Sequence, residues 1–156
     1  MHLLFVCTGN TCRSPMAEAI GRRMAAERGL DDLTVSSAGT SAWEDAPASD
    51  GALLVAMEHE VDLNAHRARV LSREIVTGAD LILVMGPHHL ERAQVLGGEG
   101  RSHLLTAYAS RDNSAEAVVD PFGGDLEQYR TTFTDLERTI ARSLDRLVAE
   151  RGAGGA

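Results

Sequence analysis

Short apolar segments alternate with amphipathic segments along the chain, and this pattern predicts the secondary structure. Residues 2–6 and 80–85 are apolar and too short for helices, so each is expected to form a buried strand. Residues 33–37 and 103–105 are expected to form two further strands. Strands that alternate with helices build a parallel sheet covered on both faces, so the pattern predicts an α/β fold.

Helices are expected between these strands, where capping residues precede segments with one apolar face. Ser14, followed by Pro15, is expected to cap the first helix, which Gly29 ends. Residues 49–60 are expected to form a second helix that buries Leu53, Leu54, Met57 and Val61. Ser72 is expected to cap a short helix, and Pro87 to begin one that ends at residues 97–98.

The C-terminal third is expected to contain one long helix after an irregular segment at residues 107–119. Asp125 is expected to cap this helix. Its apolar stripe consists of Leu126, Tyr129, Phe133, Leu136, Ile140, Leu144 and Leu147. Residues 1–151 are expected to form one domain, and residues 152–156 a disordered Gly/Ala tail.

Composition narrows the class of protein. The net charge of −8 argues against nucleic acid as a partner. No apolar segment approaches the ~20 residues of a membrane span, and the N-terminus lacks the features of a signal peptide, so no membrane association is expected. Both cysteines lie in one segment, which argues against a disulfide framework and indicates the cytoplasm. A monomer is expected.

The segment from Cys7 to Ser14 combines residues suited to phosphoryl chemistry between a strand and a helix. The N–H groups of such a loop point toward one centre, and the helix N-terminus adds partial positive charge there. This positive potential should lower the pKa of the Cys7 thiol. Arg13 can donate two hydrogen bonds to two phosphate oxygens. The segment therefore predicts a cysteine nucleophile in a phosphate-binding loop. The alternative is a buried Cys7 at the end of a core strand, with Arg13 as a surface charge.

Asp120 is the candidate proton donor. Pro121 keeps it out of helical geometry, and Phe122 and two glycines follow in a segment that could overhang a pocket. A carboxylic acid there could protonate the leaving group and then activate water. An ordinary turn before a helix is the alternative. His88 and His89 are expected to face solvent in the first turn of a helix, and no cluster has the spacing of a metal site.

The segment from Cys7 to Glu18 resembles the low-molecular-weight protein-tyrosine phosphatase family, and most closely its protein-arginine-phosphatase branch. Segments at 37–40, 66–69 and 120–124 are also similar to that family. The resemblance implies a single domain with strand order 2-1-3-4, and a hydrogen-bond network of Asn10, Ser37 and His66 that supports the loop. The residues expected to bind phosphate are Thr8, Gly9, Asn10, Thr11, Cys12 and Ser14.

Thr11 and Phe122 bear on the substrate. Tyrosine-specific family members usually have an aliphatic residue at the position of Thr11, whereas the arginine-phosphatase branch has threonine, whose hydroxyl can accept from a guanidinium. Those members commonly have two aromatic residues where this chain has Phe122 and Gly123. Trp43 is expected either to form the opposite wall or to pack in the core; both remain open.

The sequence thus predicts a cysteine-dependent protein phosphatase that acts through a phosphocysteine and prefers phosphoarginine over phosphotyrosine. Phosphorylated proteins are the expected substrates, inorganic phosphate is the product and an inhibitor, and no metal or cofactor is expected because Arg13 and the loop amides supply the charge stabilisation. Arsenate reduction is disfavoured because no cysteine follows Cys12. Cys12 is expected either to form a reversible disulfide with Cys7 or to be a buried apolar residue behind the loop.

Overall fold

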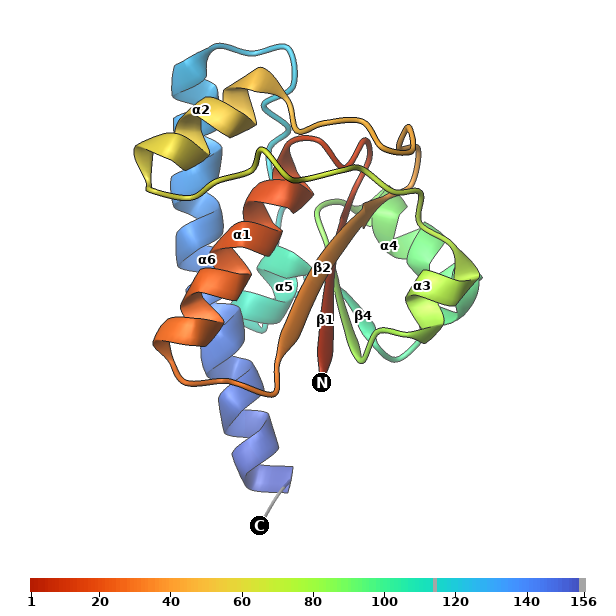
Figure 1. Ribbon diagram of the computed structural model, residues 1–156. Coiled ribbons are helices and arrows are strands. Elements are labelled where there is room, and N and C mark those ends of the chain that lie inside the picture. Colours follow the sequence, from red (N-terminus) through yellow and green to blue (C-terminus); the bar gives the residue numbers. More distant parts are fainter. Residues whose placement is uncertain (114, 155–156) are drawn as a thin grey trace.

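The structure, a computed structural model, describes residues 1–113 and 115–154. Its centre is a four-stranded parallel sheet in the order β2-β1-β3-β4, which confirms the predicted fold (Figure 1). The strands are β1 (His2–Cys7), β2 (Thr34–Gly39), β3 (Leu81–Val84) and β4 (Ser102–Leu104).

Helices cover both faces of this sheet (Figure 1). The first face is covered by α1 (Arg13–Glu27), α5 (Leu105–Ser110) and α6 (Leu126–Gly154), and α2 (Asp50–Glu58) packs against α1 and α6. The opposite face carries α3 (Arg73–Thr77), α4 (Pro87–Ala93) and η1 (Gln94–Gly98), a π-helical turn that continues α4.

The two faces account for the continuously apolar central strands. Side chains alternate along a strand, so Leu3 and Phe5 of β1 pack under α1 and α6, whereas Leu4 and Val6 pack under α3 and α4. All four are buried. Since both sets are covered, β1 is fixed in the middle of the sheet and its end at Cys7 is held in place.

Some predicted boundaries and faces differ from the structure. Helix α1 begins at Arg13 with Cys12 at its N-cap, so Ser14 lies within the first turn and is not the cap. The segment expected to be irregular after β4 begins with α5. Arg111, in the left-handed conformation with φ 61°, ends that helix.

The predicted buried face of α2 is partly wrong: Leu53 and Val61 are partly buried against the core, but the other two predicted residues are exposed. Leu54 and Met57 are 51% and 64% exposed, and the helix instead buries Ala52, Val55 and Ala56. Small residues are needed because α2 lies close to α6: a Cβ on Gly51 would lie 2.5 Å from the ring of Tyr129.

The long C-terminal helix begins as predicted and continues further than predicted. The backbone N–H of Gln128 donates to Asp125 Oδ1 over 2.9 Å, which makes Asp125 the cap. The stripe from Tyr129 to Leu147 is buried against α1 and the sheet. The structure extends α6 to Gly154, where the sequence predicted a tail from residue 152; residues 155–156 lie outside the described residues.

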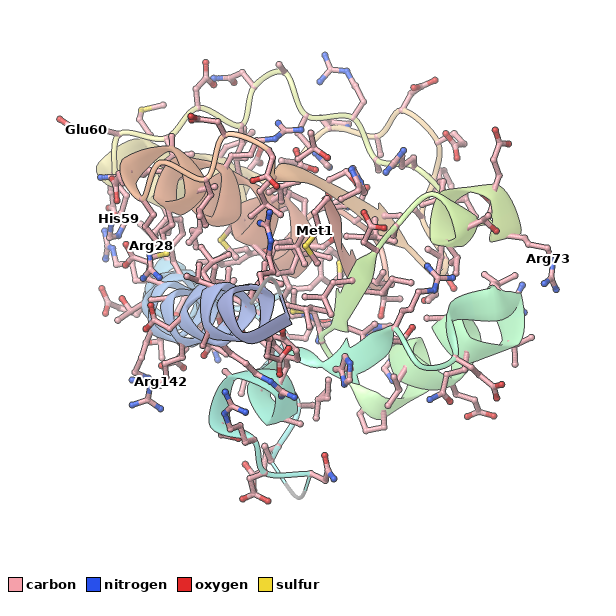
Figure 2. The ribbon with its side chains drawn as sticks, turned by 90° about the horizontal axis from the view of Figure 1, so that it is seen from below. Met1, Arg28, His59, Glu60, Arg73 and Arg142 are labelled. Atoms are coloured by element: carbon pink, nitrogen blue, oxygen red, sulfur yellow. The ribbon has the colours of Figure 1, made fainter. Side chains whose placement is uncertain are left out.

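The end of the molecule opposite the Cys7 loop is seen in Figure 2, where Met1 precedes β1 and the side chains of Arg73 and Arg142 extend outward. Among the described residues, no helix is long and apolar enough to span a membrane.

Candidate active site

The loop between β1 and α1 lies at the carboxyl end of the central strand, clamped by the end of β2 (Figure 1). Thr40 N–H donates to Cys7 O over 3.0 Å, and Ser41 N–H donates to Thr8 O over 2.9 Å. Gly39 permits this approach, since a Cβ there would lie 2.4 Å from Thr8 O. The neighbouring strand thus fixes the path of the loop.

The Cys7 thiol is buried at the base of this loop, with 2% of the residue exposed. Its Sγ lies 2.8 Å from Ser14 Oγ. Burial raises the pKa of the thiol, and this effect outweighs the opposing hydrogen bonds of Ser14 and the nearby Arg13 and Asn10. The expectation of a lowered pKa is therefore not met, because burial destabilises the thiolate more than these donors stabilise it.

Arg13 and Asp120 lie close to each other beside the Cys7 loop. Arg13 is buried and donates from Nη1 to Val118 O over 3.1 Å. Its Nη2 lies 3.5 Å from Asp120 Oδ2, and the Asp120 side chain is half exposed. Asp120 Oδ1 accepts from the backbone N–H of Phe122 over 3.0 Å. These contacts hold a carboxyl group at the edge of the loop.

A cavity of about 180 Å³ brings the candidate chemical groups together. It is lined by Cys7, Thr8, Gly9, Thr11, Cys12, Arg13, Asp120 and Phe122. Trp43 does not line this cavity and is 84% exposed, so it is neither the opposite wall in this structure nor a core residue.

Asn10 supports the loop from behind the cavity. It is fully buried and has a left-handed conformation, with φ 57°, which asparagine tolerates better than most residues. Its Nδ2 donates to Ser14 Oγ over 2.8 Å and to Ser37 Oγ over 2.9 Å. Its Oδ1 accepts from the backbone N–H of Arg69 over 3.0 Å. Asn10 therefore joins the loop to α1, to β2 and to the segment before α3.

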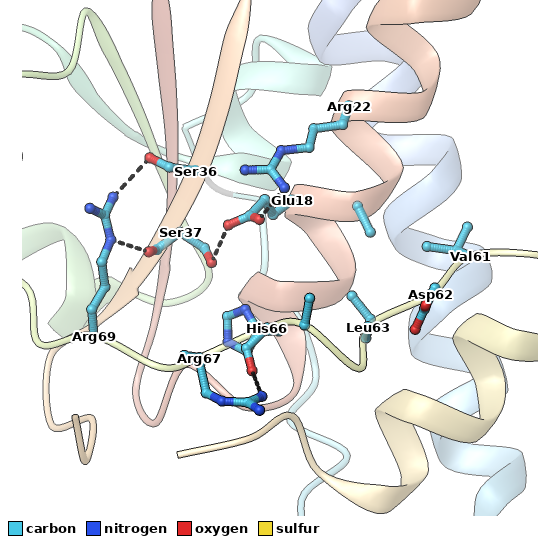
Figure 3. Close-up of a pocket in the computed structure, with 12 residues that line it drawn as sticks. Glu18, Arg22, Ser36, Ser37, Val61, Asp62, Leu63, His66, Arg67 and Arg69 are labelled. Carbon is cyan, nitrogen blue, oxygen red and sulfur yellow. Dashed lines mark hydrogen bonds and ion pairs between the residues drawn. The ribbon is translucent and has the colours of Figure 1, made fainter. Parts of the chain in front are cut away.

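His66 and Ser37 join this network, as the resemblance implied. His66 Nε2 lies 2.7 Å from Asn10 O, and Ser37 Oγ donates to Glu18 Oε1 over 2.8 Å. Arg69 adds a contact that the sequence did not assign, since its Nε donates to Ser37 O over 2.9 Å (Figure 3). The cavity in Figure 3, about 520 Å³, lies beside these supports and does not include Cys7 or Asp120.

Cys12 lines the cavity and also contacts the helices behind it. Its Sγ lies 3.2 Å from Ser49 Oγ and 3.4 Å from the Tyr129 hydroxyl. Burial and the contact with Cys12 raise the pKa of Tyr129 to about 12. Both cysteines are free thiols.

His89 is a site residue that the sequence placed wrongly. It is fully buried at the start of α4, and its Nε2 lies 2.8 Å from Thr8 Oγ1. The third position of a helix that begins at Pro87 was expected to face solvent, as the neighbouring His88 does. Only the tertiary arrangement, which brings α4 beside the Cys7 loop, identifies the contact.

Among the described residues, no group of three or more His, Cys, Asp or Glu side chains could hold a metal ion. The groups that could stabilise an anion in the 180 Å³ cavity are the Arg13 guanidinium, the Thr8 and Thr11 hydroxyls and the loop backbone.

The chain is similar to known proteins over nearly its whole length. Residues 2–152 match the family model described as low molecular weight phosphotyrosine protein phosphatase. The protein-arginine-phosphatase of Bacillus subtilis (strain 168) is 36% identical over 97% of this chain and 99% of its own. The low molecular weight protein-tyrosine-phosphatase Wzb of Escherichia coli (strain K12) is also 36% identical, over 96% of this chain and 97% of its own. A solved structure of a YwlE arginine phosphatase mutant with a phosphorylated active site serine has a TM-score of 0.90 and 35% identity, covering 97% of this chain and 98% of that one.

Proposed function

Because the chain belongs to the low molecular weight phosphotyrosine protein phosphatase family, we propose that it hydrolyses phosphorylated proteins through a phosphocysteine at Cys7, with phosphoarginine as the preferred substrate. The observation that carries the proposal is the 180 Å³ cavity, where Cys7, Arg13 and Asp120 meet. A nucleophile, an anion-binding cation and a proton donor are the groups that phosphoryl transfer to sulfur requires.

In the first step the Cys7 thiolate attacks phosphorus, so a sulfur–phosphorus bond forms while the bond to the leaving nitrogen or oxygen breaks. Asp120 gives its proton to the leaving group. Arg13 and the loop amides hold the phosphoryl oxygens, whose charge grows in the transition state. Ser14, 2.8 Å from Sγ, stabilises the thiolate before attack and after release.

In the second step a water molecule attacks the phosphocysteine. Asp120, now a carboxylate, accepts the proton of that water, and the sulfur–phosphorus bond breaks. Inorganic phosphate and the Cys7 thiolate are the products, so phosphate should also act as a competitive inhibitor. The half-exposed position of Asp120 supports this role, because water can reach the carboxylate.

The preference for phosphoarginine depends on Thr11, which lines the cavity. Its hydroxyl has only a weak contact in the structure, 3.8 Å from Cys12 Sγ, and so has capacity to accept from a guanidinium N–H. Phe122, 73% exposed at the rim, would contact the substrate side chain. Phosphotyrosine is the second candidate substrate, which the similarity to Wzb favours.

The proposed setting is the cytoplasm, where free thiols stay reduced, and the proposed active species is a monomer. The supporting observation is that the nucleophile is one of two free cysteines in the same cavity, which an oxidising compartment would join or oxidise further.

Cys7→Ser tests the mechanism. It is expected to abolish turnover while phosphate still binds, because only the nucleophilic atom changes. In the wild-type enzyme, acid quenching during turnover should trap one phosphoryl group on the peptide that contains Cys7, and Cys12→Ser should leave that label on Cys7. Sustained hydrolysis by Cys7→Ser, or a label elsewhere, would contradict the mechanism.

Thr11→Ile tests the substrate preference. The ratio of kcat/KM for phosphoarginine over phosphotyrosine peptides is expected to fall roughly tenfold to a hundredfold, the effect of losing a buried hydrogen-bond acceptor. Thr131→Ile, on the exposed surface of α6, is the matched control and should leave the ratio unchanged. If the ratio is unchanged in Thr11→Ile, Thr11 does not determine the substrate preference.

A further inference from the structure

Within the part of the chain that the structure describes, the buried side chain of His89 has one hydrogen-bond partner, and that partner belongs to the phosphate loop. His89 Nε2 lies 2.8 Å from Thr8 Oγ1. His89 Nδ1 is buried and has no hydrogen-bond partner among the described residues. It faces the backbone of Gly86, where an added Cβ would lie 3.5 Å from Nδ1. Thr8 is therefore the hydrogen-bond partner of the imidazole among the described residues, and the ring of His88 packs against it with 3.9 Å between ring centroids.

This arrangement selects one tautomer of the imidazole. A neutral imidazole has one N–H donor and one acceptor nitrogen. Buried N–H groups without a partner are rarer than under-satisfied acceptors. The proton therefore belongs on Nε2, where it donates to Thr8 Oγ1, and the unpaired Nδ1 is the acceptor. Burial, with a smaller contribution from His88 and Arg13, lowers the pKa of His89 to about 3, so the ring stays neutral.

The tautomer fixes the direction of the Thr8 hydroxyl. Once Thr8 Oγ1 accepts from His89, the hydroxyl proton of Thr8 must point away from the imidazole. Thr8 is one of the residues that line the 180 Å³ cavity, so this proton can point into the cavity. The same cavity contains Cys7 and Arg13. A hydroxyl proton directed into this space is a donor for an anion.

We propose that His89 is a positioning residue that turns the Thr8 hydroxyl into a hydrogen-bond donor for the bound phosphoryl group. The inference rests on the proposed phosphatase function and adds to it a side-chain donor beside Arg13 and the loop amides. Without His89 the hydroxyl would rotate freely, and it would lose this rotational freedom each time a phosphoryl group binds. The donor is thus set before substrate arrives.

The tautomer can be measured without any substitution. Long-range nitrogen–proton NMR correlations of the imidazole are expected to show His89 protonated at Nε2 and not titrating between pH 5 and 8. Protonation at Nδ1 would overturn the proposal, because Thr8 would then donate to His89 and have no proton for the phosphoryl group.

Substitutions test the consequence for binding, with the inhibition constant of inorganic phosphate as the readout. Thr8→Val is expected to weaken phosphate binding roughly tenfold to a hundredfold, the range for a hydrogen bond to a charged group. Thr8→Ser keeps the hydroxyl and should weaken binding less than Thr8→Val does. His89→Leu should weaken binding less than Thr8→Val does, and the double variant should be no weaker than Thr8→Val alone, because both changes remove one donor.

His89→Gln separates positioning from packing, since its amide keeps an N–H donor within reach of Thr8. It is expected to recover most of the phosphate affinity that His89→Leu loses, and Glu91→Gln, at an exposed position of the same helix, should match wild type. Additive losses in the double variant, or no difference between Gln and Leu at 89, would overturn the proposal. If wild type itself hydrolyses no phosphorylated peptide, the proposed function fails instead, and the NMR result still decides the tautomer.

Discussion

Replacing Asn10 by alanine removes the side chain at the centre of the loop's support. Asn10 is fully buried, and it makes three side-chain hydrogen bonds, to Ser14 Oγ, Ser37 Oγ and the backbone N–H of Arg69. It also has φ 57°, a conformation that Asn tolerates better than Ala. Asn10→Ala should therefore destabilise both the fold and the geometry of the phosphate site.

The magnitude follows from these contacts. Each lost hydrogen bond costs about 1 kcal/mol, since its partners are buried or partly buried. The left-handed conformation adds about 1 kcal/mol for alanine. The expected loss in the free energy of unfolding is therefore about 4 kcal/mol. At a denaturant dependence of about 2 kcal/mol per molar urea, the midpoint of unfolding should fall by about 2 M.

Urea unfolding followed by circular dichroism measures this loss, and kcat/KM measures the effect on the site. Asn64→Ala is the matched control: Asn64 is exposed and its side chain donates to Asp62 Oδ1 on the surface, so the free energy of unfolding of this variant should change by less than about 0.5 kcal/mol. A loss below about 1 kcal/mol for Asn10→Ala, together with unchanged kcat/KM, would refute the claim that this network holds the loop.

Three further predictions concern the chemical groups of the cavity. Asp120→Ala should strongly slow hydrolysis of phosphotyrosine peptides but spare activated aryl phosphates, whose leaving groups need no proton; equal losses on both would argue against an acid role. Mild peroxide should join Cys7 and Cys12 in a disulfide, seen by mass as a loss of two hydrogens that reductant reverses; sulfinic acid on Cys7 as the first product would exclude this protection. Burial raises the pKa of Cys7 and the Ser14 hydroxyl opposes the rise, so Ser14→Ala should raise that pKa further. Since the thiolate forms as pH increases, the rising limb of the kcat/KM profile should then move to higher pH, and an unmoved limb would contradict the role of Ser14.

Local patterns predicted the positions of the strands and of the Cys7 loop, whereas the strand order 2-1-3-4 was implied by the resemblance to the family, because the pairings join segments far apart in the sequence. The apolar segments of β1 and β3 needed burial on two faces, and the spacing of Cys7 and Arg13 placed both around one loop. Tertiary contacts decided the rest. The buried face of α2 follows from the close approach of Tyr129 to Gly51, which no periodicity within α2 reports.

The positions of His89 and Trp43 show the same limit. A histidine in the first turn of α4 is ordinary on the surface, and only the packing of α4 beside the loop brings it to Thr8. The sequence around Trp43 is compatible with a wall of the site or with a core residue, yet the structure leaves Trp43 84% exposed. The pKa of Cys7 was misjudged for a related reason, because the extent of burial depends on what covers the loop.

The most direct test of the central claim is a parallel measurement of kcat/KM on two peptides that differ only in carrying phosphoarginine or phosphotyrosine. The wild-type protein should hydrolyse both, and the value for phosphoarginine should be the higher, because Thr11 offers a hydroxyl to the guanidinium. An equal or higher value for phosphotyrosine would contradict the proposed preference, and turnover of neither peptide would contradict the phosphatase itself.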